Sequence, residues 1–209
     1  MNKGIVVTGD ISGFTKISAK EREVIISSLK DWAITWSEPG HFEFFRGDSF
    51  QFLSLKADEA LTRSLQLRCR LKNFLSKKQK PVLDAKLSIG TGEISYFGKS
   101  VLDADGQAFH LSGRSFEKIA ETRFRIVTDN DKLNKQLEII ADLLNIIITD
   151  WTGPQAEVVF LLLEDKTQQQ MADELQIVQS AVNNRIKLAR WRETERTLNY
   201  IISLLNELL

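Results

Sequence analysis

The sequence lacks both the paired cysteines that disulfide bonds need and the long apolar segments that cross membranes. The 209 residues include a single cysteine, Cys69, so a disulfide framework is excluded and a reducing compartment is expected. Only three prolines occur, and a hydrophobic fraction of 43% favours a packed core over disorder. No apolar run approaches the roughly 18 residues needed to span a bilayer, and the N-terminus lacks the apolar region of a signal peptide. We therefore expect a soluble cytoplasmic protein with no membrane partner.

An excess of charge of one sign is also missing. Lys and Arg number 28, as do Asp and Glu, which gives a formal net charge of zero. The sequence therefore offers no global basic field of the kind that indicates nucleic-acid binding, and the local distribution of charge becomes the informative quantity.

Hydrophobic periodicity changes near residue 152. Before that point, period-two apolar runs alternate with amphipathic helical patterns, which predicts an α+β domain over residues 1–128 and a linking helix over 129–151. After it, short helical patterns without strands predict an all-α domain over 152–209. The expected strands are 5–8, 83–89, 124–127 and two within a hairpin at 41–55. The expected helices are 19–36, 57–77, 107–121, 129–150, 152–164, 178–192 and 194–209, with one more between Thr167 and a break at Gln176-Ile177.

Two aspartates follow apolar strand residues directly. Asp10 comes after Val6-Val7-Thr8-Gly9, and Asp48 lies in the predicted turn of the hairpin. Carboxylates at neighbouring strand ends, with a main-chain carbonyl such as that of Ile11, could share Mg²⁺ or Mn²⁺, because hard cations prefer oxygen ligands. The alternative is that each Gly-Asp pair only forms a turn.

Residues 9–14, 46–48, 89–94 and 106–114 form four segments that resemble, in order, the motifs of class III nucleotide cyclases. Gly47-Asp48-Ser49-Phe50-Gln51 and Asp105-Gly106-Gln107-Ala108-Phe109 further resemble motifs of the bacterial SatD-like family. The resemblance to cyclases implies a ferredoxin-like sheet, metal ligation by Asp10 and Asp48, and a helix that supplies transition-state groups.

The cyclase-like catalytic set is incomplete. His110 stands where the family has its transition-state Asn, whereas Arg114 occupies the position of the family's Arg. Phe44 falls at the adenine-recognising Lys and cannot hydrogen-bond a base. Because loss of one such donor commonly lowers turnover about 100- to 1,000-fold, we expect a non-catalytic domain, with Arg114 and His110 as weak catalytic candidates.

The C-terminal domain contains two capping boxes, one at Thr152-Gly153-Pro154-Gln155 and one at Thr167-Gln168-Gln169-Gln170. Residues 170–186 resemble the helix-turn-helix of sigma-region-4 and LuxR-type regulators. Gln176 stands where such turns usually have Gly, and a left-handed conformation there would cost roughly 1 kcal/mol.

In a helix-turn-helix, the second helix enters the major groove with its N-terminal residues facing the bases. Gln and Asn side chains can pair with adenine edges, and basic side chains can reach phosphates or guanine. The expected DNA-binding residues are Gln179, Ser180, Asn183, Asn184, Arg185, Lys187 and Arg190.

Three functions remain open from the sequence. The favoured one is a DNA-binding transcriptional regulator whose cyclase-like domain senses a nucleotide or other small ligand, or dimerises. The alternatives are a metal-dependent phosphoryl-transfer enzyme acting on a nucleotide and a protein-interaction scaffold. The apolar face of residues 194–209 either packs back on the domain or pairs with a second subunit, and we expect a homodimer.

Overall fold

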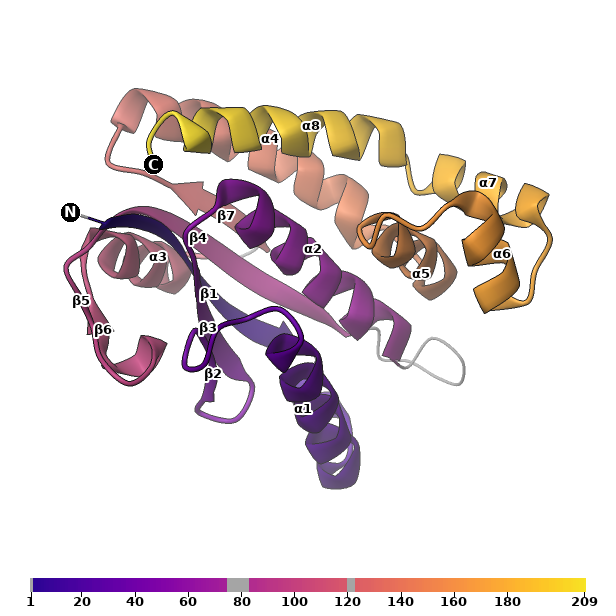
Figure 1. Cartoon of the computed structure of the whole chain (residues 1–209), viewed down its shortest axis with the longest axis horizontal. Helices are drawn as coiled ribbons and strands as arrows, with labels where there is room; N and C mark the ends of the chain where they lie inside the picture. The colour runs from indigo at the N-terminus through magenta and orange to yellow at the C-terminus, as the bar shows by residue number, and fades with distance from the viewer. Residues whose placement is uncertain (1, 75–82, 120–122) are drawn as a thin grey trace.

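A mixed five-stranded sheet forms the centre of the protein (Figure 1). The computed structural model describes residues 2–74, 83–119 and 123–209, and in that part of the chain it has eight α-helices, so the expected α+β class is confirmed. The strand order is β2-β3-β1-β4-β7, antiparallel throughout except for the parallel pair β4 and β7. The strands are β1 (Asn2–Ser12), β2 (Phe42–Phe45), β3 (Ser49–Ser54), β4 (Asp84–Ile94) and β7 (Phe124–Val127).

Strand β1 is longer than the sequence pattern predicts. Gly9 does not end it but pairs with Phe50 of β3 on one side and with Leu87 of β4 on the other. A Cβ atom at position 9 would collide with the Phe50 ring. The glycine therefore makes room for an aromatic side chain of the core, and the strand continues through Asp10 to Ser12.

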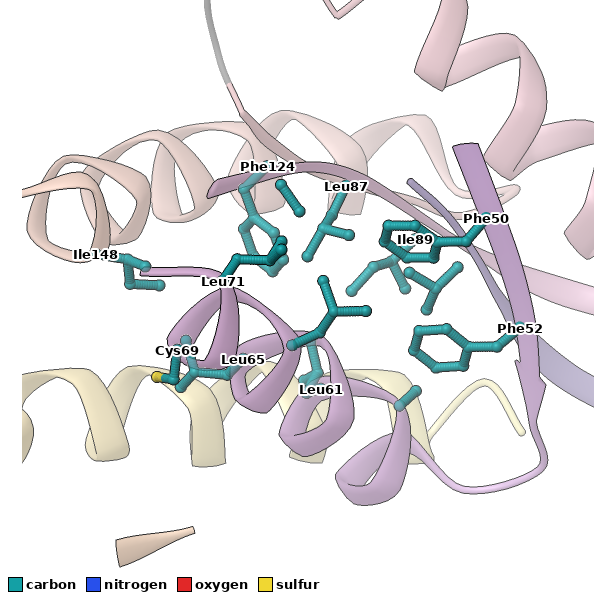
Figure 2. Close-up of a cluster of buried hydrophobic side chains, with 14 of the residues drawn as sticks. Phe50, Phe52, Leu61, Leu65, Cys69, Leu71, Leu87, Ile89, Phe124 and Ile148 are labelled. Carbon is teal, nitrogen blue, oxygen red and sulfur yellow. The ribbon is translucent and has the colours of Figure 1, made fainter. Parts of the chain in front are cut away.

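Three helices, α1 (Ala19–Ile34), α2 (Ala57–Phe74) and α4 (Asp131–Thr149), share one hydrophobic core with the sheet. Figure 2 shows the heart of this core, where Leu71 of α2 points toward Phe124 and Leu87 of the strands and Leu65 lies beside Cys69 on the other side of the helix. The predicted helix 57–77 is observed as far as Phe74, and its last residues lie outside the described part of the chain.

Helix α3 (Gln107–Glu117) covers the opposite face of the sheet. A Cβ atom at Gly90 would meet the carbonyl oxygen of Ala108 and the backbone of Ser112, so this glycine allows α3 to lie close against β4. The predicted helix 107–121 ends earlier, at Glu117, and residues 120–121 are not described. A short ribbon of β5 (Tyr96–Phe97) and β6 (Ala104–Asp105) precedes α3, and the 3-10 turns are Phe14–Lys16 and Val101–Asp103.

The C-terminal third consists of four helices: α5 (Gly153–Leu162), α6 (Gln168–Leu175), α7 (Gln179–Leu188) and α8 (Trp191–Asn206). The predicted helix 178–192 is in fact interrupted, because Arg190 is left-handed at φ 52° and α8 begins directly after it. Helix α8 runs back along α2 and α4 (Figure 1), and its apolar residues Leu198, Ile201 and Leu205 join the same core as the sheet. Hydrophobic packing is therefore continuous across position 152, and of the two arrangements expected for the terminal helix, packing back is observed.

A buried ionic cluster joins α2, β4 and α4. Asp84 accepts two hydrogen bonds from the Arg68 guanidinium at 2.8 Å each, and Lys72 Nζ lies 3.3 Å from the same carboxylate. Arg68 also donates to Asn145 Oδ1 of α4 at 3.1 Å. Burial alone would raise the pKa of Asp84, but Arg68 and Lys72 together outweigh it and hold that pKa below its usual value.

None of the helices in the described ranges is long and apolar enough to cross a membrane.

Candidate functional site

Helix α7 is anchored by its inner side against the two helices that precede it. Val182 is completely buried and lies in a hydrophobic cluster with Met171 and Ala172 of α6 and with Val158 and Leu161 of α5. Small and branched side chains at these positions let helices approach closely. The anchoring leaves the other side of α7 facing solvent.

The connection between α6 and α7 is a tight turn. Gln176 adopts the left-handed conformation (φ 54°, ψ 44°) that was expected there if the segment folds as a helix-turn-helix. Its conformation allows the Ile177 N–H to donate to the carbonyl oxygen of Ala172 at 3.0 Å, which closes the end of α6. The connection that sets the direction of α7 thus consists of three residues, 176–178, and none of them is glycine.

The solvent-facing side of α7 is polar and amide-rich. Five of the residues expected to contact DNA lie exposed on it, and Arg190 is exposed in the turn that follows. Val178, directly before α7, is also 68% exposed and adds an apolar group that the sequence analysis missed. The exposed expected residues of α7 are Gln179, Ser180, Asn183, Asn184 and Lys187.

Arg185 differs from its neighbours. It is only partly exposed, and its Nη1 lies 3.3 Å from Oε2 of Glu157 in α5. The other carboxylate oxygen of Glu157 accepts from Asn73 Nδ2 of α2 at 3.2 Å. Arg185 therefore ties α7 to the body of the protein, and it does not point freely outward as its place in the sequence suggested.

Positive charge gathers at the C-terminal end of α7. Lys187, Arg190 and Arg192 are all exposed there, whereas Asp173 and Glu174 expose negative charge on α6. A polyanion that approaches α7 would be attracted toward the end with Lys187 and repelled from α6. This local asymmetry exists although the net charge of the chain is zero.

The second candidate site lies where the β1–β3 ladder ends, at Asp10 of β1 and at Asp48 in the turn before β3. Asp10 pairs with Ser49 in the strand ladder, and the Ser49 hydroxyl donates to Asp10 Oδ1 at 3.1 Å. The N–H of Ile11 donates to the carbonyl oxygen of Asp48 at 3.2 Å. The structure thus places side by side the three residues that the sequence suggested as metal ligands.

Electrostatics at this pair favour a neutralising partner. Burial is the main cause that raises the pKa of Asp10, and the neighbouring carboxylate of Asp48 raises it further. The hydrogen bond from Ser49 and the charge of Lys86 oppose these effects without overcoming them. A cation would relieve the repulsion between the two carboxylates.

A polar network continues from Asp10 along the α3 side of the sheet. Gln51 Nε2 donates to Thr8 Oγ1 at 3.0 Å, and the Ser112 hydroxyl of α3 lies 2.7 Å from the same oxygen. This network was not predicted from the sequence, although the alternation Ser49-Phe50-Gln51-Phe52 indicates a polar side of β3.

The two weak catalytic candidates come from α3. His110 and Arg114 are exposed on α3, whose buried side is formed by Ala108, Phe109 and Ser112. His110 Nε2 is 2.8 Å from Asp105 Oδ1. Within the described residues, Arg114 forms no hydrogen bond or ion pair with either aspartate.

Phe44, at the position that resembles the base-recognising Lys, packs edge-on against Phe42 and Phe50 with ring centroids 5.4 and 5.7 Å away. It belongs to an aromatic cluster of the hairpin.

The described part of the chain contains no group of three or more His, Cys, Asp or Glu side chains placed to hold a metal ion. A cation at Asp10 and Asp48 would therefore need main-chain or water oxygens as further ligands. Comparison with models of protein families and with curated proteins found no match to this chain.

Proposed function

We propose that the protein is a DNA-binding transcriptional regulator in which α6 and α7 act as a helix-turn-helix. The observation that carries this proposal is the outer side of α7. It presents Gln, Ser, Asn and Lys side chains together on a helix that is anchored only by its opposite side. A rigid helix with an exposed amide-rich face is what direct recognition in the major groove requires.

The local geometry supports this interpretation. Two helices joined through left-handed Gln176, with Ala172 and Val182 buried where they meet, match the pattern from which the motif was expected. In the proposed complex, Asn183 and Gln179 pair with base edges, and exposed Val178 contacts thymine methyl groups. Lys187 and Arg190 bind phosphates.

In this proposal the first domain is a sensor or a dimerisation domain without turnover. The strand order β2-β3-β1-β4, with α1 and α2 on one face, supports a ferredoxin-like, cyclase-like architecture. His110 pairs with Asp105, and among the described residues Arg114 forms no hydrogen bond or ion pair with Asp10 or Asp48, which favours a role other than catalysis.

Asn183→Ala tests the proposal. It removes a base contact without touching the buried side of α7, so specific DNA affinity should fall roughly 10- to 100-fold, as expected for one lost bidentate pair. Asn206→Ala is the matched control, because Asn206 is also exposed but lies at the far end of α8. Equal affinity of wild type and Asn183→Ala for the selected sequence would contradict the proposed orientation of α7.

A second candidate function is metal-dependent nucleotide chemistry, and the approach of Asp10 and Asp48 is the observation that favours it. Two adjacent carboxylates fit Mg²⁺ or Mn²⁺, which would supply a Lewis acid for phosphoryl transfer. This function predicts hydrolysis or cyclisation of a nucleoside triphosphate that needs the metal and is lost in both Asp10→Asn and Asp48→Asn. Absence of turnover across a panel of nucleoside triphosphates would remove this candidate.

A further inference from the structure

Helix α4 is apolar on two sides. Leu137, Ala141, Leu144 and Ile148 face the core and are buried. On another side, Ile139, Leu143 and Ile146 are 64%, 61% and 60% exposed. We call these three residues the α4 seam. Their spacing of four and three residues places them on one stripe of the helix. Three large aliphatic side chains in a row on the surface indicate an interaction site.

The α4 seam borders a groove between α4 and α8. The groove has a volume of about 560 Å³, and Leu143 forms part of its wall. Tyr200 of α8, itself 51% exposed, lines the opposite wall together with Glu193 and Arg196. The apolar surface therefore extends from the α4 seam toward α8, and a tyrosine at its border is typical of interfaces.

Charge is distributed unequally along the same stripe. Lys132 and Lys135, both exposed, precede the α4 seam by one to two turns, and exposed Asp150 follows it by one turn. If two α4 helices packed in parallel, like charges would meet. In an antiparallel pair, the lysine end of each helix lies beside Asp150 of the other. The surface is therefore complementary to itself under a two-fold rotation.

We propose that the protein forms a two-fold symmetric homodimer in which the α4 seams of two copies pack antiparallel. The occupant of the exposed apolar face is a second copy of this chain, because the stripe provides both the apolar contact and the matching charges. The dimer buries Ile139, Leu143 and Ile146 against their counterparts. None of these residues is among the proposed DNA contacts, so this inference stands independently of DNA binding.

Sedimentation equilibrium of the full chain tests the proposal. The apparent mass should rise with protein concentration from 23.8 kDa for one chain toward twice that value. Leu143→Glu should raise the dimer dissociation constant at least about 30-fold, because a central apolar contact becomes a charge in a desolvated interface. Ile34→Glu is the matched control, since Ile34 is 75% exposed on α1 and lies away from α4. Circular dichroism of each variant checks that the helices remain intact.

Charge reversal tests the antiparallel arrangement. Lys132→Glu with Lys135→Glu, or Asp150→Lys alone, should each weaken the dimer about 2- to 10-fold, and all three changes together should restore it. A chain that stays monomeric up to about 200 μM would overturn the proposal. An unchanged dimer dissociation constant in Leu143→Glu would equally overturn it. So would failure of the three combined charge reversals to restore the dissociation constant of the wild type. DNA affinity of the monomeric Leu143→Glu variant, measured separately, distinguishes failure of the dimer from failure of the proposed function.

Discussion

The guanidinium of Arg185 in α7 lies 3.3 Å from the carboxylate of Glu157 in α5, so one of the expected DNA contacts is engaged within the protein. Both side chains are about one-quarter exposed or less. The pair joins the helix proposed to bind bases to the helix on which it packs. If Arg185 left Glu157 to contact a DNA phosphate, DNA binding would weaken the contact between α7 and α5.

Glu157→Gln should strengthen DNA binding several-fold. The substitution frees Arg185 to contact a phosphate, and one additional phosphate contact steepens the dependence of log affinity on log salt concentration by about 0.9. Binding titrations at several salt concentrations measure both quantities. Glu195→Gln is the control, because it removes the same charge from an exposed position in α8. Identical effects of the two variants would show that net charge, and not the release of Arg185, is responsible.

Gln176→Gly should stabilise the protein by about 0.5–1 kcal/mol. Gln176 is held at φ 54°, where glycine avoids the steric penalty that a Cβ atom imposes. Chemical denaturation provides the measurement, and Gln176→Ala should give no comparable gain since alanine keeps the Cβ atom. A destabilised glycine variant would mean that the Gln side chain contributes more than its backbone costs.

Asp84→Asn should destabilise the fold by about 3–5 kcal/mol, because Arg68 and Lys72 would remain buried without a counter-charge. The pKa of Asp84 is lower in the folded than in the unfolded protein, so its stabilisation is present above the unfolded pKa of about 3.9 and is lost as pH falls through the folded value. The difference in unfolding free energy between wild type and Asp84→Asn should therefore shrink below about pH 4. A difference independent of pH would contradict the ionic role of Asp84.

Asp10→Asn should stabilise the protein at neutral pH by on the order of 0.5 kcal/mol, a small value because Asp10 is partly exposed and solvent screens its charge. Burial and Asp48 raise the folded-state pKa of Asp10, so the destabilisation by ionised Asp10 develops as pH rises above the unfolded pKa of about 3.9 and is complete above the folded pKa. The gain should vanish as pH falls through the folded pKa to below about 3.9. Saturating Mg²⁺ or Mn²⁺ should reverse the order of stability if the pair binds metal, and thermal unfolding with and without the cation shows whether it does.

Local patterns were sufficient to predict much of the secondary structure. The capping boxes expected at residues 152–155 and 167–170 are formed, with Gln155 Oε1 and Gln170 Oε1 each accepting from the N-cap amide at 2.8 Å. The hairpin at 41–55 and the α+β class also follow from periodicity and turn residues. These features depend on residues close together in the chain, which is why the sequence alone indicates them.

Features that depend on contacts between distant segments could not be predicted in the same way. The end of α7 at Leu188 is set by left-handed Arg190 and by a hydrogen bond from Trp151 Nε1 to the Ala189 carbonyl at 2.8 Å, across 38 positions. Arg185 was expected to face DNA because its partner, Glu157, is 28 residues away. The exposure of the α4 seam could not be predicted either, because apolar residues lie on two sides of α4 and only contacts with distant segments decide which side is buried.

Selection of bound fragments from random DNA, followed by salt titration of the enriched sequences, tests the central claim most directly. A regulator that uses α7 should enrich a discrete motif, bind it with steep salt dependence, and lose specific affinity in Asn183→Ala but not in Asn206→Ala. Failure to enrich any sequence at low salt would contradict the assignment of α6 and α7 to DNA binding.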